Sequence, residues 1–405
     1  MHLLLSWRNI WRNPKRTLII LLAVIVGAWS MLAFSALSRG IMASVLSNAL
    51  NTLTGHIQVQ AEKYRDDPVV ENRINTPGPL KNILDNHLPK GSVWGFRIQV
   101  GGVASNARNA QSITIVGIEP KKEASLSFYA DMMTQGDILT PGDDKEIIVG
   151  KALADTFETK LGRKILLMSQ GTDQETASRA FRIKGIFKAE LEATEKQFVF
   201  ISLSAAQKML KMNTAVTNAA VKLPDLELVG PVAQTLSDQL PRDMSVLTWQ
   251  QLLPLVKGYI SMFDSFMLLW YVVGFLAMAF GLVNTMLMAV LERTREFGLL
   301  KALGMKPARI IINVLLECLF LLIMGLLAGN LLGAATVSAL SGGIDLSFLA
   351  QGSEFFGMGN RVFPFLIARD IISVNLVILV LGLLVCLYPA VKAGCITPKD
   401  AMAKA

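Results

Sequence analysis

Residues 17–38, TLIILLAVIVGAWSMLAFSALS, decide the fold, because some 20 apolar residues follow one another without a charged side chain. At a rise of about 1.5 Å per residue, a helix of this length crosses a hydrocarbon core of about 30 Å. A secretory signal peptide has an apolar core of only about 7–15 residues and ends at a small-residue cleavage site. This run is longer, and the following Arg39-Gly40 makes a poor site. We therefore predict an uncleaved membrane-spanning helix.

Three more apolar runs, at residues 263–291, 310–340 and 371–391, complete a set of four predicted spans. Lysine and arginine gather before the first run, between the second and third, and after the fourth, and such basic flanks mark the cytoplasmic side of a membrane. The net charge of +8 is thereby explained without nucleic acid, so no nucleic-acid partner is expected. We predict both termini in the cytoplasm, an inner-membrane location, and a large segment on the other side.

The hydrophobic fraction of 52% and the charged fraction of 17% average a membrane part and a soluble part. Short alternating runs at 56–60, 112–116 and 181–186 predict strands, and periodicity at 80–86, 151–161 (ending at Gly162) and 202–212 predicts helices. Because these do not alternate strictly, a doubly wound parallel sheet is not expected. The predicted class is an α-helical membrane protein with four transmembrane helices and an inserted mixed α/β extracytoplasmic domain. The predicted order is a leader helix at 1–16, the first span at 17–40, the outer domain at 41–259, a stalk with the second span at 260–291, a cytoplasmic coupling segment at 292–309, the third span at 310–340, an outer loop at 341–370, the fourth span at 371–391 and a cytoplasmic tail at 392–405.

The leader has the pattern of a short helix lying in the membrane interface, although an ordinary juxtamembrane leader is equally compatible with it. Tryptophan rings on one side suit headgroup depth, with arginines on the other. The residues concerned are Trp7, Arg8, Trp11 and Arg12.

Catalytic chemistry is not indicated by any motif. Neither a phosphate-binding loop nor a nucleophile elbow occurs, and His2, His56 and His87 are too scattered for a metal cluster. Cys318 and Cys386 lie in apolar runs and Cys395 follows the last, so the middle domain has no disulfide framework. We expect no enzyme activity, metal or cofactor on this chain.

Glu317 is the one ionisable residue that lies clearly within an apolar run. Such a residue is a functional hypothesis by default. It is close to the cytoplasmic end, so we favour contact with polar neighbours and a packing or orienting role over a proton site. With so little buried charge, the energy for any transport is expected to come from elsewhere.

Residues 284–304 predict a helix that leaves the membrane and continues into the cytoplasm, with Gly304 ending it and Pro307 in the first turn of the next helix. Two glutamates four residues apart stand beside arginines, while Phe297, Leu300 and Leu303 form an apolar stripe. A plain positively charged anchor needs neither feature, so we predict a docking site for a partner protein.

This segment resembles the signature of the FtsX/MacB-type permeases, also called type VII ABC transporters. The basic leader up to Thr17, the tail around Pro389 and Pro398, and segments such as 117–120 and 147–150 are similar to the family in the same order. The resemblance implies a MacB-like periplasmic core domain and a dimer with a second permease copy or paralogue. It also implies a separate ATPase that carries ATP and magnesium and moves the outer domains through stalks at 39–50 and 252–263. ATPase docking would fall on Glu292, Arg293, Arg295, Glu296, Phe297, Gly298, Leu300, Lys301, Leu303 and Gly304, with the tail from Lys392 as a weaker candidate.

Residues 54–59 and Trp249-Gln250 are most similar to the LolC/LolE lipoprotein-releasing permeases of that family. The resemblance implies a lipophilic or lipid-anchored substrate, membrane lipid around it, and a periplasmic carrier. In the LolC permeases, a loop of the outer domain grips that carrier. A polar loop occupies a comparable place in this sequence but lacks the expected prolines, so a simple exposed hairpin is favoured there. Its residues are Gln170, Gly171, Thr172, Asp173, Gln174 and Glu175. The alternative is an FtsX-like subunit that regulates a cell-wall hydrolase without transport, but an outer segment of about 220 residues favours the transporter.

Overall fold

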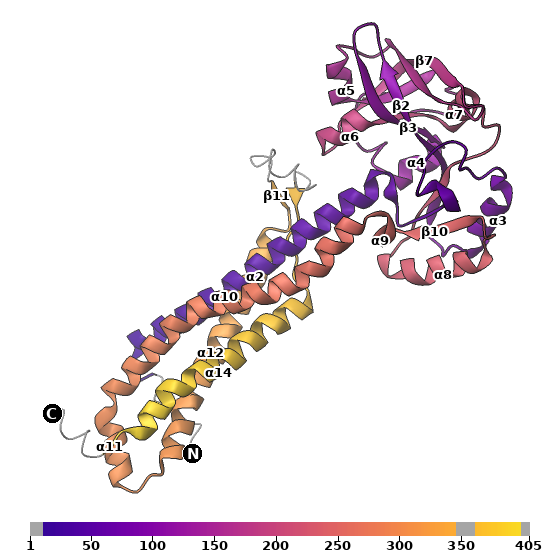
Figure 1. Ribbon diagram of the computed structural model, residues 1–405. Coiled ribbons are helices and arrows are strands. Elements are labelled where there is room, and N and C mark those ends of the chain that lie inside the picture. Colours follow the sequence, from indigo (N-terminus) through magenta and orange to yellow (C-terminus); the bar gives the residue numbers. More distant parts are fainter. Residues whose placement is uncertain (1–10, 346–360, 398–405) are drawn as a thin grey trace. The chain divides into compact units, whose positions relative to one another are not determined.

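A computed structural model describes residues 11–345 and 361–397, and these divide into two compact units (Figure 1). The membrane unit comprises the chain up to residue 43 and residues 259–345 and from 361 onward. The outer unit comprises residues 44–258. The predictions for Trp7 and Arg8, for the middle of the 341–370 loop and for the end of the tail lie outside the described residues.

Four helices in the described part of the chain are long and apolar enough to cross a membrane. They are α2 (Pro14–Ala49), α10 (Pro254–Glu292), α12 (Pro307–Ala339) and α14 (Ala368–Cys395). Apolar side chains from all four share one buried cluster. The predicted class, four spans with an inserted mixed α/β domain, is confirmed.

Helices α2 and α12 approach closely through glycines on one face of α12. Gly325, Gly329 and Gly333 are spaced four residues apart, so they lie above one another on the helix. A Cβ atom added at Gly325 would lie 2.7 Å from Cβ of Val24, and one added at Gly329 would lie 2.7 Å from Cβ of Ala28. Small residues at this spacing are the usual way for helices to pack in a membrane, where apolar burial gives no advantage over lipid.

Helices α12 and α14 are joined by a covalent bond and a polar pair. Cys318 and Cys386 form a disulfide, with their Cα atoms 6.7 Å apart. The side chains of Asn330 and Asn375 donate to each other reciprocally, at 2.9 and 3.2 Å. The sequence placed both cysteines in apolar runs but gave no reason to pair them.

The described part of the outer unit contains a ten-stranded sheet in the order β10-β1-β9-β2-β3-β8-β5-β7-β4, with β6 paired to both β2 and β7. Its pairs are antiparallel except β3 with β8 and β5 with β7, as expected for strands and helices that do not alternate. The strands are β1 (Ile57–Ala61), β2 (Val93–Ser105), β3 (Ala110–Ile118), β4 (Met133–Gly136), β5 (Glu146–Gly150), β6 (Lys164–Gln170), β7 (Thr176–Phe187), β8 (Phe198–Ser202), β9 (Asn218–Lys222) and β10 (Met244–Thr248).

Short helices cover this sheet and connect its strands. They are α3 (Pro77–His87), α4 (Pro120–Leu126), α5 (Lys151–Thr156), α6 (Glu192–Gln197), α7 (Leu203–Leu210), α8 (Val229–Gln239) and α9 (Trp249–Leu252). One prediction was wrong: the helix expected over 151–161 ends at Thr156, and Gly162 (φ +79°) lies in the turn before β6 instead of capping a helix.

Both faces of the central strands are buried. Along β3, Ile115 packs in one apolar cluster and Val116 in another, because successive side chains of a strand point to opposite faces. In β5, Ile147 and Ile148 divide in the same way. The second cluster also contains Leu53, which comes from the end of the stalk helix.

The end of α2 enters the outer unit through an irregular turn. Residues Leu50–Thr54 form a π-helical segment in which Leu53 has φ of +61°. Arg97, fully buried in β2, donates to the Leu53 carbonyl oxygen at 2.5 Å and to both oxygens of Glu123 at 2.9 and 2.6 Å. A buried arginine with a carboxylate and a carbonyl as acceptors fixes this turn in place.

Candidate functional site

The elbow is the turn between α10 and α12, residues 292–306, and it contains a short helix, α11 (Thr294–Ala302). A single helix continuing to Gly304 was predicted, and this is wrong, because Arg293 (φ −100°, ψ 15°) interrupts it. Thr294 donates its hydroxyl to the Leu291 carbonyl oxygen at 2.7 Å. Threonine side chains compete in this way with the helical backbone pattern, which favours a break at this position.

The far end of the elbow has the geometry of a Schellman motif. The N–H of Gly304 donates to the Lys301 carbonyl at 2.9 Å, and the N–H of Met305 donates to the Leu300 carbonyl at 3.0 Å. Gly304 has φ of +89°, a conformation that costs other residues more. Pro307 then begins α12. Gly304 therefore terminates α11, as the sequence indicated.

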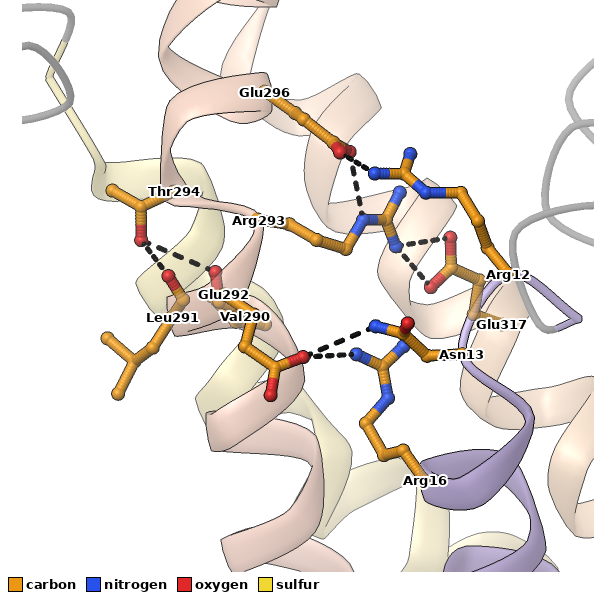
Figure 2. Close-up of polar contacts among 10 residues, drawn as sticks. All are labelled: Arg12, Asn13, Arg16, Val290, Leu291, Glu292, Arg293, Thr294, Glu296 and Glu317. Carbon is orange, nitrogen blue, oxygen red and sulfur yellow. Dashed lines mark hydrogen bonds and ion pairs between the residues drawn. The ribbon is translucent and has the colours of Figure 1, made fainter. Parts of the chain in front are cut away.

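An arginine at the break holds two carboxylates together (Figure 2). Arg293 donates through Nη1 to both oxygens of Glu317, at 3.0 and 2.9 Å, and through Nε to Glu296 at 3.2 Å. Arg12 from the leader also pairs with Glu296. Glu317 thus contacts a polar neighbour at the elbow, as expected from the sequence, while its orienting role stays a prediction.

The leader is attached to the end of α10 by a second set of contacts. Arg16 donates to Glu292 at 3.2 Å, and Asn13 donates to the same carboxylate oxygen at 3.4 Å. Side chains from the leader and from α2, α10, α11 and α12 therefore converge, as Figure 2 shows. We call this set the elbow cluster, and its members are Arg12, Asn13, Arg16, Glu292, Arg293, Glu296 and Glu317.

The contacts of the elbow cluster differ in burial. The side chains of Arg293 and Glu317 are only 13% and 9% exposed, whereas that of Arg12 is 61% exposed. Removing one member of a buried pair leaves an uncompensated charge, while an exposed pair contributes little. Burial alone would raise the pKa of Glu296, but the hydrogen bonds from Arg12 and Arg293 outweigh it, so the pKa of that carboxyl is lowered.

The exposed face of α11 is narrower than predicted. Arg295, Leu299 and Leu303 lie four residues apart and are all exposed, the leucines by 63% and 77%. Phe297 was expected in the docking stripe, but it is 4% exposed and packs in the bundle core, with Leu300 packed against that core. The predicted apolar stripe of Phe297, Leu300 and Leu303 was therefore wrong for Phe297 and Leu300, because their side of α11 faces the other helices, whereas Leu303 is exposed.

The remaining predicted coupling residues are divided between these two sides. Three of them belong to the elbow cluster, where they form ion pairs with other residues of the same chain: Glu292, Arg293 and Glu296. Gly298 is buried, Lys301 is half-buried, and Gly304 is exposed at the turn. Of the predicted leader residues that the structure describes, Trp11 is exposed and Arg12 belongs to the elbow cluster.

The predicted outer partner loop is the turn of the antiparallel β6–β7 hairpin. Thr172 donates its N–H to the Leu210 carbonyl at 3.1 Å and its hydroxyl to the Lys211 carbonyl at 2.9 Å. Lys211 also pairs with Asp173. The turn is a simple hairpin attached to the end of α7, and carrier binding by it stays a prediction.

Sequence reasoning missed a second polar set, the Arg39 cluster. Arg39 donates to both oxygens of Asp370 at 2.9 Å each and to Asp264 at 2.8 Å. Ser35 donates to Asp370 at 2.9 Å and accepts from the Tyr271 hydroxyl at 3.0 Å. The cluster joins α2, α10 and α14, and its members are Ser35, Arg39, Asp264, Tyr271, Arg369 and Asp370.

A signal for this cluster was present in the sequence. Arg39 immediately follows the first apolar run, Asp264 is the second residue of the second run and Asp370 immediately precedes the fourth. Opposite charges at the same end of three spans are costly unless they pair. Their placement at one membrane face therefore predicts a pairing that the sequence separations of 225 and 331 residues conceal.

Residues 17–239 match the family described as MacB-like periplasmic core domain, which covers more than half of the chain. Residues 268–398 match the FtsX-like permease C-terminal family. The lipoprotein-releasing system transmembrane protein LolC of Xylella fastidiosa is 25% identical over 308 residues, 71% of each chain.

The macrolide export ATP-binding/permease protein MacB of Agrobacterium fabrum is 23% identical over 421 residues, which are 98% of this chain and 59% of that protein. Among solved structures, the periplasmic region of MacB from Actinobacillus actinomycetemcomitans is 11% identical, with a TM-score of 0.36, and covers 53% of this chain and 97% of its own. The two family matches, which account for the outer unit and the membrane helices, place the chain in the FtsX/MacB-type family of ABC transporter permeases, whose members work with ABC ATPase partners.

Proposed function

We propose that this chain is the permease subunit of an ATP-driven transport system in which a separate ABC ATPase docks on α11. The observation that carries the proposal is the exposed Arg295–Leu299–Leu303 face, on a helix whose other side is fixed by Phe297 and the elbow cluster. Exposed leucines in a helix otherwise held by its own chain are suited to a partner. In this proposal ATP and magnesium bind to the partner, and no catalytic role is assigned to this chain.

Force applied to α11 has a defined route through the protein. The buried Arg293–Glu317 pair ties the elbow to α12, and the Arg16–Glu292 pair ties it to α2. Helices α2 and α10 each continue without interruption from the membrane unit into residues of the outer unit. A helix transmits displacement along its length, so ATPase motion would reach the outer unit without any channel through the bundle.

The state of the buried charges supports this mechanical function. Glu317 and Asp370 are the carboxylates nine-tenths or more buried within the four described spans, and each is bound by an arginine. A proton- or ion-coupled pathway normally needs ionisable groups that can change partners. We therefore infer that energy enters at the elbow and not through an ion gradient.

The proposed orientation puts both termini and the elbow in the cytoplasm and the outer unit outside. Basic residues of the leader and of residues 293–309 support it, because such flanks remain on the cytoplasmic side. The proposed assembly is a dimer with a second copy or a paralogue. The name of the LolC relatives, a lipoprotein-releasing system, supports a lipophilic or lipid-anchored, lipoprotein-like substrate. A periplasmic carrier that receives this substrate is a further part of the proposal.

Docking is tested with the full chain co-expressed with its ABC ATPase and reconstituted in liposomes. Leu299→Asp combined with Leu303→Asp should abolish co-purification of the ATPase, because two carboxylates would be desolvated in the interface. Leu226→Asp, at an exposed leucine of the outer unit, is the control and should retain the ATPase. Retention by the double variant would reject α11 as the docking surface.

The substrate class needs a second measurement. ATP-dependent release of a lipidated protein from proteoliposomes is expected with the wild-type chain and should fail with the docking variant. If ATP hydrolysis is coupled but nothing leaves the membrane, and a pull-down recovers a cell-wall hydrolase, the chain transmits force without transport.

A further inference from the structure

Helix α10 carries a row of exposed apolar side chains on the side opposite its buried residues. The row runs from Leu255 to Phe280 in alternating steps of four and three residues. Half of its members follow one another at intervals of seven residues: Tyr259, Phe266, Val273 and Phe280. The other half begins at Leu255 and recurs at the same interval up to Leu276. We call this row the α10 stripe.

The repeat of the α10 stripe is typical of a helix that packs on another helix. Two apolar positions in every seven correspond to 3.5 residues per turn, which keeps one side of a supercoiled helix directed at its partner. A side that contacts only lipid needs no such repeat. On α14, for example, the exposed apolar residues from Ile372 to Leu384 follow one another in steps of four.

The α10 stripe also extends beyond the part of the helix that lipid can cover. Asp264 belongs to the Arg39 cluster, which lies at one membrane face. Leu255 lies roughly 13 Å further along the helix, at about 1.5 Å per residue, and is 77% exposed. Exposure of a large apolar side chain to water is unfavourable. This end of the stripe therefore favours a protein partner over lipid.

One turn beyond Phe280, the same side of α10 presents a polar group, the carboxamide of Asn284. The side chain is exposed, and it forms no hydrogen bond with the described residues. It lies in an apolar groove together with Leu287 of α10 and Val385 of α14. An amide facing hydrocarbon without a partner is costly, and membrane helices avoid this cost by bonding such groups across a helix interface.

The asparagines on the other helices show how this cost is met within one chain. Asn330 and Asn375 bond to each other between α12 and α14. Asn284 has no such counterpart on the neighbouring helices that the structure describes. Its partner is therefore expected from outside the chain, on the side of α10 that carries the stripe.

We propose that the α10 stripe packs against the α10 stripe of a second copy of this chain, with the two helices parallel and the two Asn284 side chains hydrogen-bonded to each other. A carboxamide both donates and accepts, so the same group on a two-fold related copy satisfies it. The stripe contains no charged residue, so it meets itself without repulsion. The inference rests on the dimer of the proposed function and specifies its surface.

The surface is tested by disulfide cross-linking of the full chain in membranes of the expressing cells. Cys395→Ser is the background, because Cys395 is an exposed free cysteine. Phe266→Cys and Val273→Cys should each give a dimer linked through identical positions, since parallel helices bring like residues of the stripe together. Leu268→Cys is the matched control, because Leu268 is 55% exposed in the same part of α10 but lies outside the stripe, and it should stay monomeric.

The amide pair is tested by energy transfer between labelled copies in liposomes, at increasing dilution in lipid. Asn284→Leu keeps the surface apolar but removes the hydrogen bond, and should raise the dissociation constant of the dimer about three- to thirtyfold. Thr285→Val is the matched control, because the Thr285 hydroxyl donates to the Gly281 carbonyl of its own helix at 2.7 Å. It should leave the dissociation constant unchanged.

The interface is rejected if Phe266→Cys and Val273→Cys cross-link no better than Leu268→Cys, or if Asn284→Leu and Thr285→Val dimerise alike. Cross-links to a different protein would reject a second copy as the occupant of the stripe. Two differently tagged copies that co-purify without stripe cross-links would leave the proposed dimer intact and reject this surface alone. Copies that do not co-purify would reject both.

Discussion

The elbow cluster and the Arg39 cluster are both centred on an arginine that joins membrane helices, but they differ in how much of each is withdrawn from solvent. In the Arg39 cluster, the carboxylate of Asp370 is 4% exposed and receives both Arg39 and Ser35. In the elbow cluster, Arg293, Glu317 and Arg16 are buried to a similar degree, while Arg12 is 61% exposed. The exposed contact of Arg12 with Glu296 can therefore be exchanged at little cost, whereas the buried contact of Arg39 with Asp370 cannot.

The largest effect is expected from Asp370→Ala, which leaves Arg39 mostly buried without its main partner. Breaking a buried pair in this way costs about 3–5 kcal/mol. Thermal unfolding of the purified protein in detergent should show a much lower midpoint. Arg369→Ala is the control, because Arg369 is 71% exposed and should shift the midpoint little. Equal shifts would mean that the burial of the Arg39–Asp370 pair does not determine its contribution to stability.

Glu317→Ala should have the next largest effect, because it leaves Arg293 with Glu296 as its remaining carboxylate contact at the elbow. We expect a loss of stability of about 2–3 kcal/mol. A double-mutant cycle with Arg293→Ala measures the coupling, and a coupling energy near zero would mean that the pair does not join the elbow to α12.

A smaller effect is expected from Gly329→Val, which tests the contact of α2 with α12. The added side chain meets Ala28, and overpacking of this kind costs about 1–3 kcal/mol. Gly281→Val is a matched control in α10, since no described heavy atom lies within 4 Å of a Cβ atom added there. If both variants unfold at the same temperature, the glycine face is not a packing surface.

The smallest effect concerns acid titration of the elbow. Because the pKa of Glu296 is lowered by folding, its contribution to stability is complete above the unfolded pKa, near 4.5, and is lost as pH falls through the folded value. Glu296→Gln should therefore flatten the acid side of the stability profile. A profile unchanged by this substitution would show that Arg12 and Arg293 do not stabilise the ionised carboxyl.

The features that could be predicted from the sequence are those determined by residues close together along the chain. Span lengths and basic flanks gave the four helices, and Gly304 with Pro307 gave the end of the elbow. The break at Arg293 was missed because it depends on a side chain, Thr294, that competes with the helix locally. The burial of Phe297 was missed because periodicity gives the faces of a helix but not which face meets the bundle.

Pairings between distant residues were beyond a single sequence. Cys318 and Cys386 are 68 residues apart, and each lies in an apolar run where it resembles an ordinary small side chain. The attachment of the loop at Thr172 to the end of α7 and the contact of Arg97 with Leu53 likewise depend on how the outer unit folds.

The contact of Arg97 with Leu53 determines which motions α2 can pass on. A helix that ends in a flexible linker can transmit a displacement along its axis but not a rotation about it. Here the π-helical turn that follows α2 is bonded through Leu53 to Arg97 of the sheet and, through it, to Glu123 of α4. We expect a rotation of α2 about its own axis to arrive at the sheet as torque. Lysine cannot bond Glu123 in the same forked geometry. Arg97→Lys should therefore preserve the transmission of movement along the axis of α2 and weaken the transmission of its rotation to the sheet.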